Sequence, residues 1–320
     1  MDYKSIVAVV AEDFAAVDTF IRKSLESRVP LIHEVGQYIV QGGGKRLRPL
    51  VCLLAARACG YRGDRHIQVA GIIEMLHTAT LLHDDVVDES GLRRGRATAN
   101  ARWDNPTAVL VGDYLISRAF ALMVALREPA VMDIMSAGTV VIAEGEVLQL
   151  INQRDPDTTE DRYLQVIYGK TAKLFEVAAE TGASLGDRDY QPHCAAFARH
   201  LGAAFQIVDD VLDYTSSAEV MGKNVGDDLG EGKPTLPLIQ AIKASAPGDA
   251  ELIRNAIRTG GLEHLEEIIA IVQRCGALDY TRQRAQLESE QALAALAALP
   301  ESPYKTALQD LTRLALSRDS

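Results

Sequence analysis

The chain has 320 residues, of which 48% are hydrophobic, and carries a formal net charge of −11. This composition supplies enough apolar material for a sizeable core, and the length allows one large domain or two smaller ones. The acidic balance argues against a nucleic-acid-binding protein, which would need a basic face. Basic residues instead concentrate in two short segments, 45–48 and 93–96, a pattern that suits a small anionic substrate.

The cysteines and the N-terminus favour a cytoplasmic protein. Four cysteines occur without a CxxC pair or metal-ligand spacing, which indicates reduced, mostly buried thiols. The apolar run near the N-terminus is flanked by acids and lacks a basic region, so it does not resemble a signal peptide. Uninterrupted apolar stretches fall short of about 18 residues, and we therefore expect no transmembrane segment.

Helical patterns follow one another along the chain. Apolar periodicity in residues 1–40 predicts one or two amphipathic helices. Apolar spacing, prolines and capping residues predict further helices at about 45–59, 67–88, 105–127, 129–149, 158–173, 192–213 and 278–299. Strand-like alternation is scarce, and no linker or low-complexity segment interrupts the pattern. The sequence therefore predicts an all-α fold with a single domain over residues 1–320.

The long helix predicted at 67–88 ends in an unusual group of acids, Asp84, Asp85 and Asp88. Helical spacing places Asp84 and Asp88 on one face, with Asp85 displaced by about 100°. Like charges at this spacing repel and aspartate is a mediocre helix former, so a cation should neutralise the group. A solvated helix end would be the simpler explanation for one such group. The same D-D-x-x-D spacing recurs after a second apolar run, at Asp209, Asp210 and Asp213.

This repetition favours metal binding over a solvated helix end. Carboxylate oxygens suit Mg²⁺, which keeps several waters and commonly bridges carboxylates to the phosphates of a substrate. The two aspartate groups predict two helices that face each other across a cavity, with Mg²⁺ and phosphates between them.

Three other segments carry groups that suit a phosphorylated ligand, although each alone would be explained as a solvated surface. Lys45 and Arg48 follow a glycine-rich turn at a helix start, where the backbone can approach a ligand and anions are favoured. A cation and a hydroxyl are adjacent at Lys170-Thr171. The glycine-rich loop 221–235 places Lys223 close to the second aspartate group and predicts a lid over phosphates.

His77 and Gln206 lie in apolar helices, where such residues are more often satisfied core groups than ligands. His77 lies two turns before Asp84 on roughly the same face, and Gln206 lies one turn before Asp209, which favours a binding role for both. The chain has no P-loop, no dinucleotide-binding glycine motif and no nucleophile–base motif. The aspartates and basic segments therefore fit a substrate with a diphosphate head and a hydrocarbon body, and a reaction in which diphosphate departs and leaves a cation.

Motifs throughout the chain resemble the trans-polyprenyl diphosphate synthases, the head-to-tail prenyltransferases. The matching segments, in the expected order, are GGGKRLRP, HTATLLHDDVVDESGLRRG, GDYL, GKTAKLF, FQIVDDVLD and GKNVGDDLGEGKPTLP. In overall character the chain is most similar to the bacterial octaprenyl diphosphate synthases, which make the side chain of a respiratory quinone.

The resemblance implies a bundle of mostly antiparallel helices around a deep central cavity, assembled as a homodimer. It implies about three Mg²⁺ ions per active site, held by Asp84, Asp88 and Asp209. The other catalytic residues that it implies are Asp85, Asp210, Asp213, Lys170 and Lys223. The allylic diphosphate would contact Arg93, Lys170, Thr171, Gln206 and Lys223. The diphosphate of isopentenyl diphosphate would contact Lys45, Arg48, His77 and Arg94. Ionisation would give an allylic cation, which the isopentenyl double bond attacks before a proton is lost.

Side chains below the first aspartate group should set the length of the product. Ala79 and Thr80 lie roughly 6–8 Å down the helix from Asp84, and both are small, so they should not stop the tail as a bulky aromatic would. Leu76 continues the predicted channel, and Met123 and Met135 are candidates for its floor, although ordinary core methionines are an equally good explanation. We expect a long-chain product, octaprenyl diphosphate.

Rival functions share parts of this pattern. Geranylgeranyl and other-length synthases would have the same catalytic residues. A non-catalytic partner subunit of a heteromeric synthase would usually have lost an aspartate group or its basic residues, and here both groups are intact. A terpene cyclase would need an aromatic-rich pocket, whereas only 5% of the residues are aromatic. A membrane-surface protein would need a basic amphipathic face, which is not found.

Overall fold

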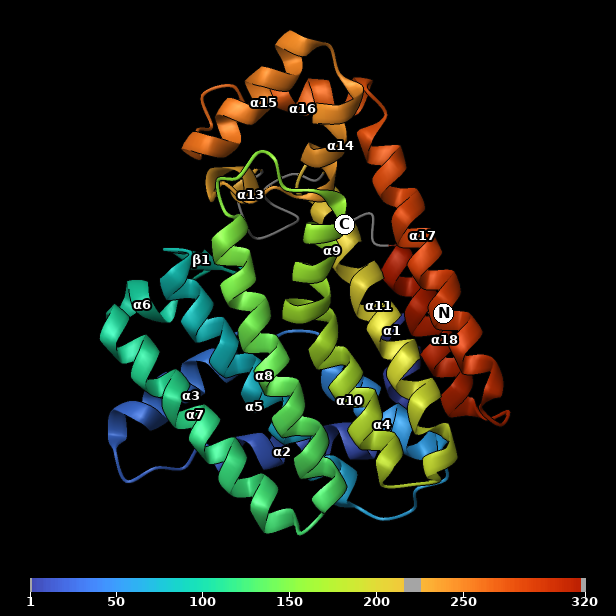
Figure 1. Cartoon of the computed structure of the whole chain (residues 1–320). Coiled ribbons are helices and arrows are strands. Elements are labelled where there is room, and N and C mark those ends of the chain that lie inside the picture. Colours follow the sequence, from blue (N-terminus) through green and yellow to red (C-terminus); the bar gives the residue numbers. More distant parts are fainter. Residues whose placement is uncertain (1, 216–225, 318–320) are drawn as a thin grey trace. The chain divides into compact units, whose positions relative to one another are not determined.

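Helices account for nearly all of the regular structure in the computed structural model, which describes residues 2–215 and 226–317 (Figure 1). Within these residues the only strands are β1 (Leu92–Arg93) and β2 (Arg96–Ala97), which pair antiparallel as a short hairpin. The predicted all-α fold is therefore confirmed.

The described part of the chain folds into two compact units, each assembled from three stretches. The first unit contains the residues up to 138, 174–198 and 295–311, and the second contains 139–173, 199–294 and those from 312 onward. Among the described residues, α8 (Pro129–Asn152), α11 (Gln191–Leu212) and α18 (Pro303–Leu316) are divided between the units, and one end residue each of two further helices, Lys173 and Ala295, also falls in the other unit. The single domain expected over residues 1–320 stays a prediction.

The first unit is organised around one long helix, α5 (Arg65–Val87), which packs against several other helices of the same unit. The other helices of this unit are α1 (Tyr3–Ala8), α2 (Ala11–Ser24), α3 (Pro30–Gln41), α4 (Leu47–Ala58), α6 (Ala99–Arg102), α7 (Asn105–Leu126), nearly all of α10 (Lys173–Ser184), η2 (Arg188–Tyr190) and η3 (Leu296–Ala298). α5 packs against α2, α4, α6 and α7, and its buried residues occupy all of its faces. A helix buried on all sides needs no polar stripe, which explains the almost continuous apolar run that leads to the first aspartate group.

Two apolar cores lie among the described residues of the second unit. Its remaining elements are α9 (Glu160–Ile167), η1 (Tyr168–Ala172), α13 (Asp227–Gly230), α14 (Leu236–Ala244), α15 (Pro247–Thr259), α16 (Leu265–Arg274) and α17 (Ala277–Ala295). One core joins α14, α15 and α16, drawn in orange in Figure 1, through buried residues such as Leu238, Ile257 and Ile268. The other surrounds Ile207 of α11 and Leu236 of α14. The second core therefore supports the helix that carries the second aspartate group.

Three local features differ from the sequence-based expectation. Residues 3–41 form three helices rather than one or two. The polar segment before Asn105 contains the β1–β2 hairpin and α6, and the hairpin turns at Arg94 (φ 53°) and Gly95 (φ 70°), the left-handed pair that a two-residue hairpin requires. The helix expected at 158–173 is interrupted by η1, a π-helical turn over Tyr168–Ala172. Periodicity alone does not reveal any of these features, because they depend on packing and turn geometry.

Two of the helices in the described residues, α7 and α8, are long and apolar enough to cross a membrane by length and composition alone, a test that core helices of soluble proteins also pass. Their most apolar windows are only 33% and 22% buried, respectively. The absence of a transmembrane segment therefore stays a prediction, and both helices present an apolar face that needs an explanation.

Candidate functional site

The three aspartates at the end of α5 have different environments. Asp85 is buried and accepts two hydrogen bonds on Oδ1 from Arg93, from Nε at 2.8 Å and from Nη2 at 2.6 Å. Burial raises the pKa of Asp85, and Arg93 opposes that rise. Asp84 and Asp88 are only partly buried. The first aspartate group thus presents two carboxylates on one helix face and keeps the third inside as the partner of an arginine.

Several of the predicted isopentenyl diphosphate ligands lie together in the first unit. Arg48 Nη1 lies 3.2 Å from His77 Nε2, and the Arg48 guanidinium stacks over the Phe175 ring at 4.5 Å. Burial lowers the pKa of Arg48 to about 10, which still leaves it charged at neutral pH. Arg94 donates to the carbonyl of Gly43, in the glycine turn before Lys45. The hairpin arginine and the α4 arginine therefore belong to one cationic region.

His77 is held neutral in this region. Burial first, and then the surrounding arginines, lower its pKa well below the usual value. Because a guanidinium can only donate, the contact with Arg48 makes Nε2 of His77 the acceptor and leaves the proton on Nδ1. Neutral His77 therefore offers an N–H donor to an anion without adding a positive charge.

Gly44 is required by this arrangement. Its backbone is left-handed (φ 136°), and a Cβ at this position would lie 2.8 Å from Cζ of Arg94. Only glycine lets the backbone turn here while the Arg94 guanidinium passes close to it.

The second aspartate group shows the same division between buried and accessible carboxylates. Asp210 is buried and accepts hydrogen bonds from the Tyr163 hydroxyl at 2.6 Å and from Gln206 Nε2 at 2.8 Å. Burial and neighbouring carboxylates, with Asp228 foremost, raise its pKa well above the usual range. Asp213 is also buried, whereas Asp209 is partly exposed. Asp209 is therefore the member of this group that a cation can reach most directly.

Predicted allylic ligands of the second unit surround this helix. Thr171 donates to Gln206 Oε1 at 3.1 Å, which links η1 to α11. Lys170 forms an ion pair with Glu146 of α8 at 2.6 Å. Both Lys170 and Thr171 lie in the π-helical turn, and such turns occur frequently at functional sites because they redirect side chains. Sequence reasoning did not identify Glu146 as the partner of Lys170.

The π-helical turn touches α8 through backbone atoms. A Cβ added at Gly145 would lie 2.6 Å from the backbone N of Lys170 and 2.7 Å from the carbonyl carbon of Gly169. Glycine at 145 thus allows the main chain of α8 to approach the segment that carries Lys170.

The remaining predicted residues are placed as follows. Lys45 is exposed, and its carbonyl accepts a hydrogen bond from the Tyr3 hydroxyl. Thr80 is partly exposed and donates to the carbonyl of His77 at 2.8 Å. Lys223 lies outside the described residues. Four proposed chain-length residues are buried, namely Leu76, Ala79, Met123 and Met135.

The aspartates fit Mg²⁺ on chemical grounds. Across residues 2–215 and 226–317, no three histidine, cysteine or carboxylate side chains already converge as a metal-binding group. Mg²⁺ does not require one, because it usually keeps several waters and binds through one or two carboxylates together with substrate phosphates. Partly exposed oxygen ligands at Asp84 and Asp88, one turn apart on α5, match that preference.

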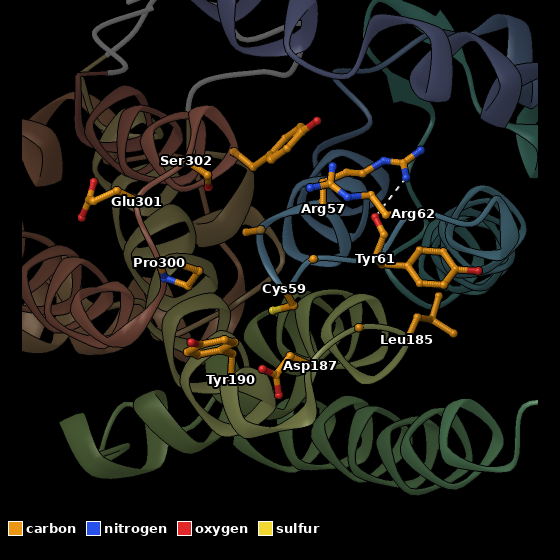
Figure 2. Close-up of a pocket in the computed structure, with 14 residues that line it drawn as sticks. Arg57, Cys59, Tyr61, Arg62, Leu185, Asp187, Tyr190, Pro300, Glu301 and Ser302 are labelled. Carbon is orange, nitrogen blue, oxygen red and sulfur yellow. Dashed lines mark hydrogen bonds between the residues drawn. The ribbon is translucent and has the colours of Figure 1, made fainter.

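A separate cavity of about 730 Å³ lies in the first unit and contains none of the predicted site residues (Figure 2). It is lined by the end of α4 and the turn after it, by the segment 185–190, and by residues near Pro300.

Comparison with known proteins gives a consistent result. Residues 29–274 match the polyprenyl synthetase family. The chain is 59% identical to an all-trans-nonaprenyl-diphosphate synthase (geranyl-diphosphate specific) of Rhodobacter capsulatus over 99% of both chains. It is 50% identical to the octaprenyl diphosphate synthase of Escherichia coli (strain K12) over 100% of both chains. The structure of a polyprenyl synthase from Caulobacter crescentus, complexed with calcium and isoprenyl diphosphate, is also similar. The match includes 100% of this chain and 98% of that chain, with 41% sequence identity and a TM-score of 0.96.

An all-helical fold that carries two D-D-x-x-D groups and a cationic region, together with these relatives, defines a prenyltransferase. The chain belongs to the polyprenyl synthetase family. It is a long-chain trans-polyprenyl diphosphate synthase, and the resemblance noted in its sequence motifs is confirmed.

Proposed function

We propose that the protein is an octaprenyl diphosphate synthase that extends farnesyl diphosphate with isopentenyl diphosphate, acts in the cytoplasm, and makes the side chain of a respiratory quinone. The observation that supports the mechanism is that each aspartate group contains both accessible and buried carboxylates. Asp84, Asp88 and Asp209 are partly exposed, whereas the other three aspartates are buried. The accessible carboxylates are the ones suited to hold Mg²⁺.

The buried aspartates then act as supports. Asp85 orients Arg93 toward the allylic diphosphate, and Asp210 fixes Gln206, which in turn accepts from Thr171. Mg²⁺, when bound, supplies positive charge that stabilises the oxygens of the departing diphosphate. Arg93 and Lys170 bind the same diphosphate, and Lys223 completes this set as a proposal outside the described residues.

The cationic region of the first unit would hold the second substrate. Lys45, Arg48 and Arg94 provide positive charge for the diphosphate of isopentenyl diphosphate, and His77 provides an uncharged N–H donor. Fixing this head group orients the isopentenyl double bond for attack on the allylic cation, which lowers the entropic part of the barrier. The proton lost after attack passes to the released diphosphate.

Nonaprenyl diphosphate is the second candidate product, favoured by the 59% identity to the nonaprenyl synthase of Rhodobacter capsulatus. That relative is described as specific for geranyl diphosphate, which makes geranyl diphosphate the second candidate primer. Ala79 is a small, buried residue that precedes Asp84 on α5, and a small side chain at this position is compatible with either product length.

Product analysis tests the proposal. The purified protein is incubated with farnesyl or geranyl diphosphate, excess labelled isopentenyl diphosphate and Mg²⁺, and the dephosphorylated products are resolved by length. We expect an octaprenyl product that is lost when EDTA is added. A nonaprenyl product would select the second candidate, and a geranylgeranyl product would place the end of the channel higher than Ala79 and Thr80 indicate. A complete lack of elongation would support the non-catalytic partner subunit.

The exposed apolar faces of α7 and α8 support assembly as a homodimer. Leu110 and Val124 on α7 are 66% and 56% exposed, and Ile151 on α8 is 69% exposed. Apolar side chains at these spacings follow one face of a helix. Exposed apolar helix faces of this kind are typical of interfaces, and we propose that a second copy of the chain covers them.

A further inference from the structure

Glu74 is a buried carboxylate that none of the roles above uses. It lies on α5 one turn before His77, and its Oε1 forms an ion pair with Arg46 Nη1 at 2.8 Å. Arg46 Nε also reaches Asp18 of α2 at 2.8 Å. The Arg46 side chain is thereby held between two helices of the first unit, and it is itself only 10% exposed.

The backbone of Arg46 explains why such an anchor is needed. Arg46 is the residue before α4, and it adopts a left-handed conformation (φ 45°, ψ 47°) that is strained for a side chain other than glycine. It stands between Lys45 and Arg48, both proposed to bind diphosphate. The ion pair with Glu74 directs the Arg46 side chain inward and offsets this strain, so that the flanking residues keep their orientation.

The charges around Glu74 also favour a structural role for this carboxylate. Burial raises the pKa of Glu74, while Arg46, Arg48 and Arg94 each oppose that rise. Glu74 is therefore the anion that compensates several guanidinium groups before any diphosphate is bound.

We propose that Glu74 and Arg46 form a positioning pair that holds segment 45–48 in the geometry that binds the diphosphate of isopentenyl diphosphate. This inference rests on the proposed function, because it assumes that segment 45–48 serves that substrate. Neither residue touches the substrate, so the pair acts through Lys45 and Arg48.

The test compares Glu74→Gln with Asp13→Asn. Asp13 is a matched control, because it also pairs with an arginine of the first unit, Arg57 at 2.8 Å, and has no part in the proposed site. We expect Glu74→Gln to raise KM for isopentenyl diphosphate about tenfold or more, with less than about a twofold change in kcat or in KM for the allylic diphosphate. Asp13→Asn should lower the thermal unfolding temperature without changing either KM.

Several outcomes would overturn the positioning role. An unchanged KM for isopentenyl diphosphate in Glu74→Gln, or an equal rise in KM for both substrates, would do so. Arg46→Lys, which keeps the charge but removes the forked donor, provides the same test if Glu74→Gln does not fold. The wild-type protein is assayed in parallel. If the wild type does not elongate its substrate, the proposed function is rejected; if it does and the variants show no selective rise in KM, only the positioning pair is rejected.

A second, independent feature is a pair of thiols beside the cavity of the first unit. Cys59, labelled in Figure 2, lines this cavity at the end of α4, and its Sγ lies 3.6 Å from Sγ of Cys194. A disulfide requires about 2.05 Å, so the sulfurs need to approach by roughly 1.5 Å.

We infer that Cys59 and Cys194 form a dithiol that hydrogen peroxide converts to an intramolecular disulfide. The Cys59 thiolate attacks one peroxide oxygen, the O–O bond breaks, and a sulfenic acid and hydroxide form. Cys194 sulfur then attacks the sulfenic sulfur, the S–O bond breaks, and water leaves with the thiol proton. Cys59 lines the cavity through which peroxide can approach, whereas Cys194 is not among the lining residues, so Cys194 is the resolving partner.

Peptide mapping under non-reducing conditions tests this inference. After peroxide treatment, we expect a Cys59–Cys194 linked peptide, its loss on reduction with dithiothreitol, and a higher unfolding temperature than in the reduced protein. Cys194→Ser should instead give a Cys59 sulfenic acid that dimedone traps, and the control Cys275→Ser should behave as wild type. Recovery of Cys59 and Cys194 as separately alkylated thiols after treatment would overturn the inference.

Discussion

Replacing Gly145 with alanine is a direct test of the contact between α8 and the π-helical turn. The new Cβ would meet backbone atoms of Lys170 and Gly169, at 2.6 Å and 2.7 Å, whereas ordinary contacts begin at 3.4 Å. The turn would have to retreat by 0.8 Å, the difference between 3.4 Å and 2.6 Å. Overpacking of this kind costs about 1–3 kcal/mol, and the gain in helix propensity from glycine to alanine offsets about 1 kcal/mol. Because the opposing atoms are main chain and cannot rotate away, we expect the upper end of the overpacking cost, which leaves a net loss of about 2 kcal/mol.

The assay pairs this variant with Gly248→Ala. A Cβ at Gly248 in α15 meets nothing within 4 Å, so this control carries the change in propensity without the clash. Urea unfolding gives the free energy of each protein, and steady-state kinetics give KM for both substrates. We expect Gly145→Ala alone to lose stability and to raise KM for the allylic diphosphate, because Lys170 moves with the turn. Equal stability of the two variants, together with an unchanged KM, would refute the reasoning.

Three further predictions concern other parts of the chain. Thr80→Phe should shorten the product while elongation continues, and an unchanged product length would reject the channel assignment below Asp84. The free energy of unfolding should fall between pH 7 and pH 5, because burial lowers the pKa of His66 and the unfolded chain therefore binds the proton more readily than the folded protein. Urea titrations at several pH values should show a smaller dependence on pH for His66→Gln than for the wild type. Leu110→Asp should halve the mass measured by light scattering. The control Asp113→Asn, which changes an exposed residue of the same helix, should leave the mass unchanged, and a monomeric wild type would contradict the dimer.

The sequence was sufficient for the features that depend on local periodicity. The ends of α5 and α7 fall within a few residues of their predicted positions, because apolar spacing and caps are properties of neighbouring residues. The contact between Arg48 and His77 and the link from Thr171 to Gln206 agree with the grouping that the motifs indicated. The proposed ligand roles themselves stay predictions.

Tertiary contacts account for what the sequence did not reveal. Glu146 is separated from Lys170 by a turn and a helix, so no local pattern links them. The left-handed backbone of Arg46 is stabilised by residues of two distant helices, and arginine gives no local indication of such a conformation. The π-helical turn has the same cause, because its close packing on Gly145 is a property of two segments and not of either one.

The ion pairs of Arg93 and Lys170 have a consequence for the kinetics of substrate capture. Each of these cations contacts a carboxylate of its own unit, Asp85 and Glu146 respectively. In the proposed function, an arriving diphosphate would therefore exchange partners with these groups and would not meet bare positive charges. Attraction at long range depends on unbalanced charge, and the chain as a whole is acidic. A diphosphate is repelled at long range by this net charge, so the association rate of the allylic substrate should rise as ionic strength increases, with selectivity set at short range by the exchange itself.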